Sequence, residues 1–146
     1  MPNLLNTPID FRVTRTKLGT WKRYLYQSGA LYHEFTSHTS ILGYPLLHFA
    51  NGRNPETGKI AVARGVIAIG QIARGFLAIG QVAIGVIAVG QVAIGVLAGV
   101  GQAACGIIAI GQMSAGVFCI GQFAVGHWSW AQYGTGGNLM SLFEKR

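Results

Sequence analysis

Residues 65–95 read GVIAIGQIARGFLAIGQVAIGVIAVGQVAIG, and they repeat a pattern of five residues. Glycine occupies the first position of each pentad, a bulky apolar residue the third, and alanine the fourth. The second position alternates between glutamine and an apolar residue, so that glutamine returns every ten residues. This pattern continues to Gln132 with one extra residue, Val100. An internal repeat of this kind predicts one small structural unit that is stacked many times.

A five-residue period does not suit an α-helix, because five residues advance about 500° and the glycines would spiral around every side. Each interior glycine would also cost about 1 kcal/mol relative to alanine. An extended run such as 66–69 fits better, with glycine at a corner that needs either a positive φ or close packing. The sequence therefore predicts an all-β fold, a β-solenoid of five-residue strands over residues 60–138.

The number of pentads in each coil decides which side chains share a side of the solenoid. The sequence favours four per coil, which places glutamine on two opposite sides and Phe76, Val86 and Val96 on the other two. A coil of ten residues is the alternative, and it would align all the repeat glutamines in one row. With positions 1 and 3 inward, the outward positions 2 and 5 expose more apolar surface than a soluble monomer usually shows. The extra residue at Val100 is expected at a corner, as a bulge.

The pentads resemble those of the pentapeptide-repeat proteins, whose quadrilateral coils contain four pentads each. The resemblance covers roughly residues 60–135, although this chain has glycine, valine, isoleucine and glutamine where that family has alanine and polar residues. The stretch GYPLLHFANG, residues 43–52, is similar to a strand that precedes glycine-rich AIG repeats in a set of bacterial proteins. Bactofilins, bacterial β-helical proteins that polymerise end to end near membranes, are a functional analogy. These resemblances imply a structural role and bring no enzymatic activity.

Charge is unevenly distributed along the 146 residues, of which 51% are hydrophobic and 10% charged. This composition excludes a disordered chain and most ordinary soluble enzymes. No charged residue lies between Arg74 and Glu144, whereas the basic, aromatic segment at residues 1–42 holds five of the eleven Lys and Arg residues of a chain whose net charge is +7. Residues 43–59 are predicted to form a first strand and a polar loop, and residues 139–146 a C-terminal tail.

The basic segment combines cations with an interfacial aromatic residue, the mixture that suits an anionic membrane surface or an acidic partner. A basic strand or helix that packs on the solenoid is the alternative. Nucleic acid is not expected as a partner, because the basic set is small and the repeat offers no cationic track. The residues predicted to make the membrane or acidic-partner contact are Arg12, Arg15, Lys17, Trp21, Lys22 and Arg23.

Catalytic and metal-binding patterns are sparse. Cys105 and Cys119 lie in the apolar repeat without a histidine at ligand spacing, so we expect both to be reduced and buried. His33 and His38 are five residues apart, which is not the helical spacing of a metal pair. His48 is expected in the first strand. We therefore predict no enzymatic activity, cofactor or metal, and the absence of a secretory pattern predicts a cytoplasmic location, including the inner face of the membrane.

The third position of the pentads becomes aromatic toward the C-terminus. Two interpretations remain open for Trp128, Trp130 and Tyr133: they plug the last coil, or with Phe143 they form a docking end. The docking interpretation favours polymerisation, because an open solenoid end is an unpaired sheet edge.

The sequence as a whole favours a self-assembling scaffold that forms filaments or oligomers with copies of itself, with an anionic membrane surface as a second partner. Its predicted assembly residues are Trp128, Trp130 and Tyr133 at the end and Phe76, Val86 and Val96 on the sides. Two alternatives remain: an integral membrane protein with glycine-rich helical spans, and a monomeric binding module.

Overall fold

The computed structural model describes residues 9–135 and 138–141, and within them the chain forms strands and no helix. The predicted all-β class is confirmed. None of the described residues forms a helix that is long and apolar enough to cross a membrane. The glycine-rich stretch expected to be helical in the integral-membrane alternative is instead strand, over Val62–Thr135. The strands are β1 (Arg12–Arg15), β2 (Gly19–Leu25), β3 (Leu31–Ser37), β4 (Ser40–Ile41), β5 (Tyr44–Pro45), β6 (Leu47–Asn51), β7 (Val62–Thr135) and β8 (Asn138–Ser141).

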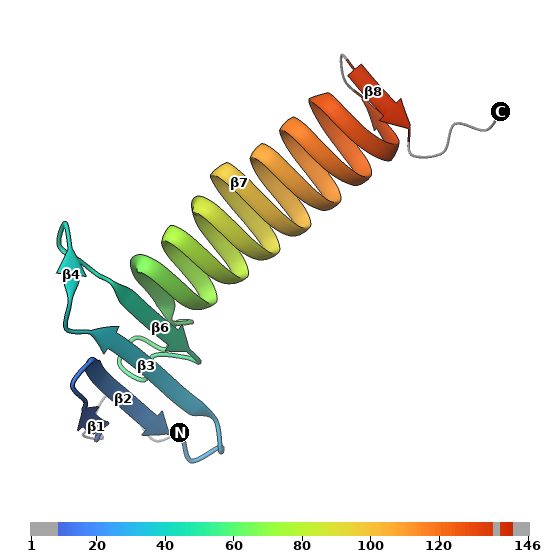
Figure 1. Cartoon of the computed structure of the whole chain (residues 1–146). Coiled ribbons are helices and arrows are strands. Elements are labelled where there is room, and N and C mark those ends of the chain that lie inside the picture. The colour runs from blue at the N-terminus through green and yellow to red at the C-terminus, as the bar shows by residue number, and fades with distance from the viewer. Residues whose placement is uncertain (1–8, 136–137, 142–146) are drawn as a thin grey trace.

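These strands form one mixed sheet and one short hairpin. The sheet has the order β1-β2-β3-β6-β7-β8, in which β1, β2, β3 and β6 are antiparallel neighbours and β6, β7 and β8 pair in parallel. The hairpin of β4 and β5 projects beside the first turns of β7 (Figure 1). We call β1, β2 and β3 the meander and β7 the coil, because Figure 1 shows β7 wound as a spring of successive turns.

Each turn of the coil takes ten residues. A Cβ added at Gly75 would meet the carbonyl oxygen of Gly65, and one added at Gly85 would meet that of Gly75. The same offset joins the coil to β8, because Trp128 is in register with Asn138. Two pentads therefore complete one turn. The expected four pentads per coil are wrong, and the ten-residue alternative describes the structure.

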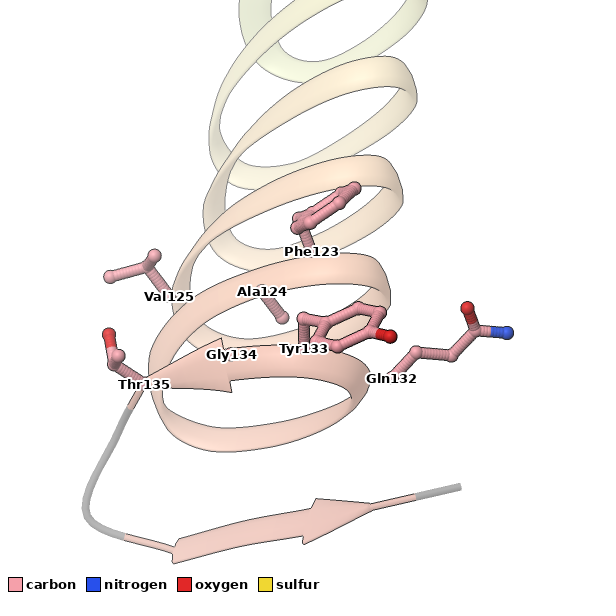
Figure 2. Close-up of a pocket in the computed structure, with 7 residues that line it drawn as sticks. All are labelled: Phe123, Ala124, Val125, Gln132, Tyr133, Gly134 and Thr135. Atoms are coloured by element: carbon pink, nitrogen blue, oxygen red, sulfur yellow. The ribbon is translucent and has the colours of Figure 1, made fainter. Parts of the chain in front are cut away.

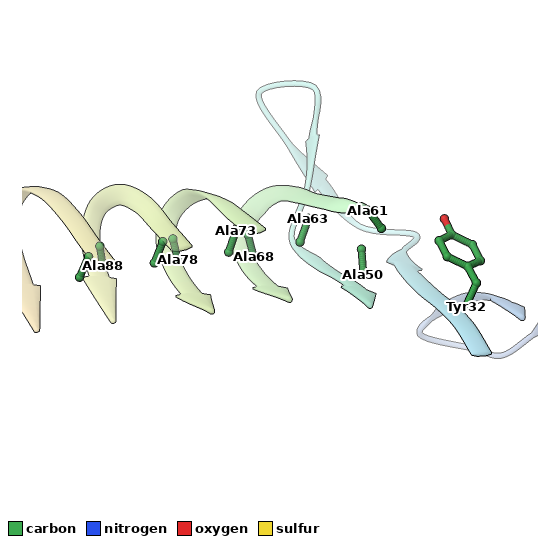
Figure 3. Packing of buried hydrophobic residues seen from close by; sticks show 10 residues of the cluster. Tyr32, Ala50, Ala61, Ala63, Ala68, Ala73, Ala78 and Ala88 are labelled. Atoms are coloured by element: carbon green, nitrogen blue, oxygen red, sulfur yellow. The ribbon is translucent and has the colours of Figure 1, made fainter. Parts of the chain in front are cut away.

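Alanine explains the narrow turn. The buried side chains of the coil come from the fourth position of the pentads. Ala68, Ala78 and Ala88, ten residues apart, are fully buried in one row (Figure 3). Ala73 and Ala83 are fully buried in the other row. Two facing pentads leave room between them for methyl groups only. Bulky third-position residues must then lie outside, so the expected inward direction of position 3 is wrong.

The glycines of the coil serve close approach rather than an unusual backbone conformation. Positive φ angles at glycine occur among the described residues only at Gly29, Gly43, Gly52 and Gly58, all of which lie outside the coil. At the first position of the pentads, a side chain would instead collide with the backbone of the turn below. Of the two reasons expected for a corner glycine, close packing is confirmed and positive φ is wrong.

The extra residue forms the expected irregularity. A Cβ at Gly101 would meet Gly90, eleven residues earlier, whereas one at Gly111 would meet Gly101, again ten residues earlier. One additional residue is thus absorbed within a single turn, as a bulge absorbs it. The buried core divides at the same place, into one cluster that ends at Ala93 and a second that begins at Ala104.

The N-terminal end of the coil is covered by other strands. Strand β6 lies on the first turn, with Leu47 in register with Ile67 and Ala50 with Gly70, and β3 lies on the far side of β6. The expected position of His48 in a strand is confirmed, because His48 belongs to β6. This strand is not the first, since β1 to β5 precede it. The coil therefore begins on a strand that the meander already holds (Figure 1).

Candidate assembly surface and the capped end

The ten-residue turn aligns equivalent side chains in rows along the outside of the coil. One row is polar and its apolar counterpart lies half a turn away. The glutamine row consists of Gln71, Gln81, Gln91, Gln102, Gln112, Gln122 and Gln132. The valine row consists of Val66, Phe76, Val86, Val96, Ile107 and Val117.

The valine row and the rows beside it expose large apolar side chains. Phe76 is 58% exposed and Val96 is 72% exposed, while Val86 is partly buried. At the third and fifth positions, Ile108 and Ile94 are 41% and 47% exposed. Because these residues sit on successive turns, their apolar surface is continuous along the coil. The predicted side residues Phe76, Val86 and Val96 therefore share one row on the surface.

The aromatic residues at the C-terminal end point outward. Phe118 stacks on Trp128 of the next turn with ring centroids 6.4 Å apart, and Phe123 stacks on Tyr133 with centroids 5.7 Å apart. Trp128, Trp130 and Tyr133 are each at least half exposed. Plugging of the last coil is therefore wrong, because the small fourth-position residues fill the interior here too. Phe143 lies outside the described residues.

Phe123 and Tyr133 form one wall of a shallow pocket on the last turns (Figure 2). The pocket has a volume of about 470 Å³, and Val125, Gln132 and Thr135 contribute to its lining. Such a wide, open hollow suits a neighbouring side chain better than an enclosed small molecule.

A chain of hydrogen bonds joins the meander to the coil at the capped end. The backbone N–H of Arg64 donates to Nδ1 of His48 at 2.7 Å, so this ring nitrogen carries no proton. The other ring nitrogen, Nε2, then donates to Oε1 of Glu34 at 3.0 Å, and the hydroxyl of Tyr32 donates to Oε2 at 2.8 Å. The bond from His48 holds the pKa of the Glu34 carboxyl below its usual value, although burial opposes this shift. Burial and the bond to Glu34 raise the pKa of the Tyr32 hydroxyl.

The structure divides the predicted basic contact residues between two faces of the meander. Arg12 is in register with Arg23, and the guanidinium of Arg23 lies 5.3 Å from the centre of the Trp21 ring on the same face. Trp21 itself packs against Phe35, with ring centroids 4.9 Å apart. The alternation of strand residues places the remaining strand cations, Arg15 and Lys22, on the opposite face. Lys17 lies in the turn between β1 and β2.

One group of residues was not singled out by the sequence. Arg64 and Arg74 occupy the same position on successive turns, and they line a groove of about 670 Å³ between the coil and the β4–β5 hairpin. The apolar side of this groove comes from the hairpin residues Leu42 and Tyr44 and from Phe76. Neither guanidinium forms an ion pair with a carboxylate of the described residues. The ten-residue spacing of the two arginines is the signal that would have identified the pair.

The two cysteines differ in their surroundings. Cys119 is buried at an inward fourth position, and its burial raises the pKa of the thiol. Cys105 is exposed because it occupies an outward fifth position, so the expectation that both are buried is wrong for Cys105. The described residues contain no group of three potential metal ligands. Nε2 of His38 lies 3.1 Å from the hydroxyl oxygen of Thr20, so His38 is not part of the hydrogen-bonded pair of His48 and Glu34.

Comparison with protein-family models, with curated proteins and with solved structures found no match to this chain.

Proposed function

We propose that the protein is a structural β-solenoid without catalytic activity, which assembles side by side with copies of itself at a membrane. The observation that carries this proposal is the continuous apolar surface of an uncharged coil, whose valine row includes side chains up to 72% exposed. Monomeric soluble proteins rarely expose apolar patches larger than a few hundred Å². The residues Phe76, Val86 and Val96 therefore need an apolar covering.

Side-by-side assembly is favoured over a head-to-tail filament. A filament that continues the strand ladder needs a free edge at both ends of the coil. At the N-terminal end this edge is occupied by β6, and β3 pairs with β6 in turn. Copies that lie beside one another require no such edge, and they form a closed oligomer when related by rotational symmetry.

The aromatic end supplies a contact of suitable chemistry. Trp128, Trp130 and Tyr133 lie on the outside of the last turns, where a neighbouring copy can reach them. Tryptophan and tyrosine are enriched at the energetic centres of interfaces, because they bury a large area and lose little conformational entropy. The membrane part of the proposal is supported by the cations of the meander and of the first two turns.

The proposal of a non-catalytic role is supported by the position of the polar cluster at the capped end. Glu34 and His48 hydrogen-bond to each other, and His48 also accepts a bond from the first turn of the coil. Their hydrogen bonds join the meander to the coil. A nucleophile or a general acid or base would instead have to face a substrate cavity.

Sedimentation of the purified protein in detergent micelles, over a range of concentrations, tests the assembly. We expect the wild type to associate and Trp130→Lys to weaken association at least tenfold, because the new charge would be buried in the contact. Leu25→Lys is the control, since Leu25 is exposed in β2 and lies outside the coil, and it should associate like the wild type. A wild-type protein that remains monomeric at every concentration would contradict the proposal.

A further inference from the structure

The uncharged part of the coil has the dimensions and surface of an element that lies within a lipid bilayer. From Arg74 to Tyr133 the chain makes just under six turns, which at about 4.8 Å per turn span roughly 28 Å. The hydrocarbon core of a bilayer is about 30 Å thick. No charged residue occurs anywhere between these two positions.

The winding of the coil removes the usual obstacle to placing a strand in lipid. A backbone N–H or C=O without a hydrogen-bond partner is strongly destabilised in hydrocarbon, so a lipid-exposed segment must satisfy these groups internally. Each interior turn of the coil lies between two others at the ten-residue offset, as the glycine contacts show. The first turn pairs with β6 and the last with β8, so neither end turn lacks a neighbouring strand.

The two ends of this segment carry the side chains that typically mark the two interfaces of a membrane. At one end, Arg64 and Arg74 stack on adjacent turns without a described carboxylate partner, although like charges so placed repel. A lipid phosphate beside them would relieve this repulsion, and Leu42, 94% exposed at the tip of the hairpin, would reach the acyl region next to it. At the other end lie Trp128, Trp130 and Tyr133, and tryptophan and tyrosine are enriched at membrane interfaces.

We propose that the coil is inserted in a lipid bilayer, with Arg64 and Arg74 at the headgroups of one leaflet, the valine row in the hydrocarbon, and the C-terminal aromatic residues at the opposite interface. The meander stays in water on the arginine side. Glutamine side chains are costly to expose to lipid. We therefore place the glutamine row against a neighbouring copy, where polar side chains can hydrogen-bond between segments within the membrane. This part of the inference rests on the proposed side-by-side assembly. Lipid thus covers the part of the valine row, with Phe76, Val86 and Val96, that neighbouring copies leave exposed.

Cys105 provides a native probe of this environment. It is exposed, and it lies about three turns from Arg74 and about three from Tyr133, at the middle of the segment that we place in lipid. Replacing Cys119 by alanine, the commonest residue of its row, leaves Cys105 as the single thiol. A nitroxide attached to Cys105 then reports on collisions with oxygen, which concentrates in lipid, and with a nickel chelate, which stays in water.

The experiment uses the full chain in vesicles of phosphatidylcholine and phosphatidylglycerol. We expect the protein to float with the vesicles and to resist alkaline extraction, and we expect the Cys105 label to gain oxygen collisions and lose nickel collisions relative to the protein in denaturant. A label at Ser28→Cys, in a background without Cys105 and Cys119, is the control, because Ser28 is exposed in the turn between β2 and β3. It should stay accessible to nickel.

A pair of lysine variants separates insertion from surface attachment. Ile110→Lys places a charge at an exposed position in the middle of the coil, where a lysine is strongly disfavoured in hydrocarbon, so we expect a loss of extraction-resistant binding. Leu25→Lys, at an exposed position of β2, should bind like the wild type. Circular dichroism in micelles must show the same strand content for both variants.

Each outcome separates the two proposals. A protein that sediments without lipid, with Cys105 shielded from both oxygen and nickel, would overturn insertion while supporting self-assembly. A Cys105 label that stays accessible to nickel on floated vesicles, or an Ile110→Lys variant that still resists extraction, would also overturn insertion. A protein that inserts but shows no energy transfer between differently labelled copies would retain insertion and contradict side-by-side assembly.

Discussion

The coil and the meander use the same residue types for different physical reasons. In the meander, large aromatic side chains such as Trp21 and Phe35 pack together, and the chain turns between β2 and β3 at Gly29, whose φ is positive. In the coil, the interior holds little more than methyl groups, and glycine is required because the backbones of adjacent turns approach closely. A regular array of strands can therefore be held together by backbone pairing even when its side chains bury little apolar surface area.

This difference also affects what each region needs from its surroundings. A fully buried leucine or phenylalanine contributes about 1.5–3 kcal/mol, whereas an alanine methyl contributes less than half of that. The meander buries its aromatic residues within the protein itself. The coil leaves its leucine, isoleucine and valine side chains on the outside, so their transfer from water depends on a partner or on lipid. Four changes test this comparison, and the largest effect is expected at the coil glycines.

Replacing Gly85 and Gly90 together by valine should prevent the coil from folding. Each new Cβ would collide with the carbonyl oxygen of the glycine ten residues earlier, and the backbone there cannot move without breaking the ladder. Circular dichroism in micelles should show a large loss of strand signal. The control is Gly43→Ala, where φ is +81° and no atom lies within 4 Å of the added Cβ, so the cost should be only about 1–2 kcal/mol of conformational strain. Equal stability of the double variant and the wild type would show that the turns are not closely packed.

Two adjacent residues test which positions face inward. Ala109 is fully buried, and Ala109→Leu should destabilise the coil by several kcal/mol because the interior has no space for three more carbons. Ile108 is 41% exposed, and Ile108→Ala should change the free energy of unfolding by less than about 1 kcal/mol. Chemical unfolding in micelles measures both values. The opposite order of the two effects would restore the interpretation in which the third position faces inward.

The sequence predicted part of this fold because the signals were local. The pentad period and the glycines indicated strands, the extra Val100 indicated a bulge, and the apolar run around His48 indicated a strand. The period alone could not give the turn size, because coils of ten and of twenty residues both contain whole pentads. An argument from side-chain size was nevertheless present: apart from the glycine position, only the fourth position is small throughout, and a wide coil cannot be filled by alanine.

The neighbours of the surface residues were harder to predict, because they depend on the number of residues in each turn and on the pairing of strands that are distant in sequence. Arg64 and Arg74 become neighbours only when ten residues make one turn. The aromatic residues near Trp128 face outward for the same reason. Glu34 meets His48 because β3 and β6 pair across the intervening β4–β5 hairpin, and no local pattern specifies that register.

A smaller change in stability is expected from Glu34, at the junction between the meander and the coil. Because the folded-state pKa of Glu34 is depressed, its contribution to stability is fully present above the unfolded value of 4.5 and is lost as the pH falls through the lower folded value. Glu34→Gln should cost about 1 kcal/mol at neutral pH, through loss of the charged hydrogen bond from His48. It should also lose less stability than the wild type between pH 6 and strongly acidic pH. Urea unfolding across that range measures the difference, and identical acid sensitivity in both proteins would show that Glu34 does not couple the meander to the coil.

Disulfide formation between adjacent turns tests the ten-residue coil most directly. In a background with Cys105→Ala and Cys119→Ala, the pair Gln81→Cys and Gln91→Cys should oxidise readily within one molecule, because equivalent residues of adjacent turns lie about 4.8 Å apart, within the range that a disulfide bridges. The pair Gln81→Cys and Val86→Cys, half a turn apart, should not. Mass spectrometry of the oxidised monomer under mild conditions reads out both pairs. The account predicts a bridge between positions 81 and 91, and a bridge that forms instead between Gln81→Cys and Gln102→Cys would contradict it, because those residues become neighbours only when four pentads complete a turn.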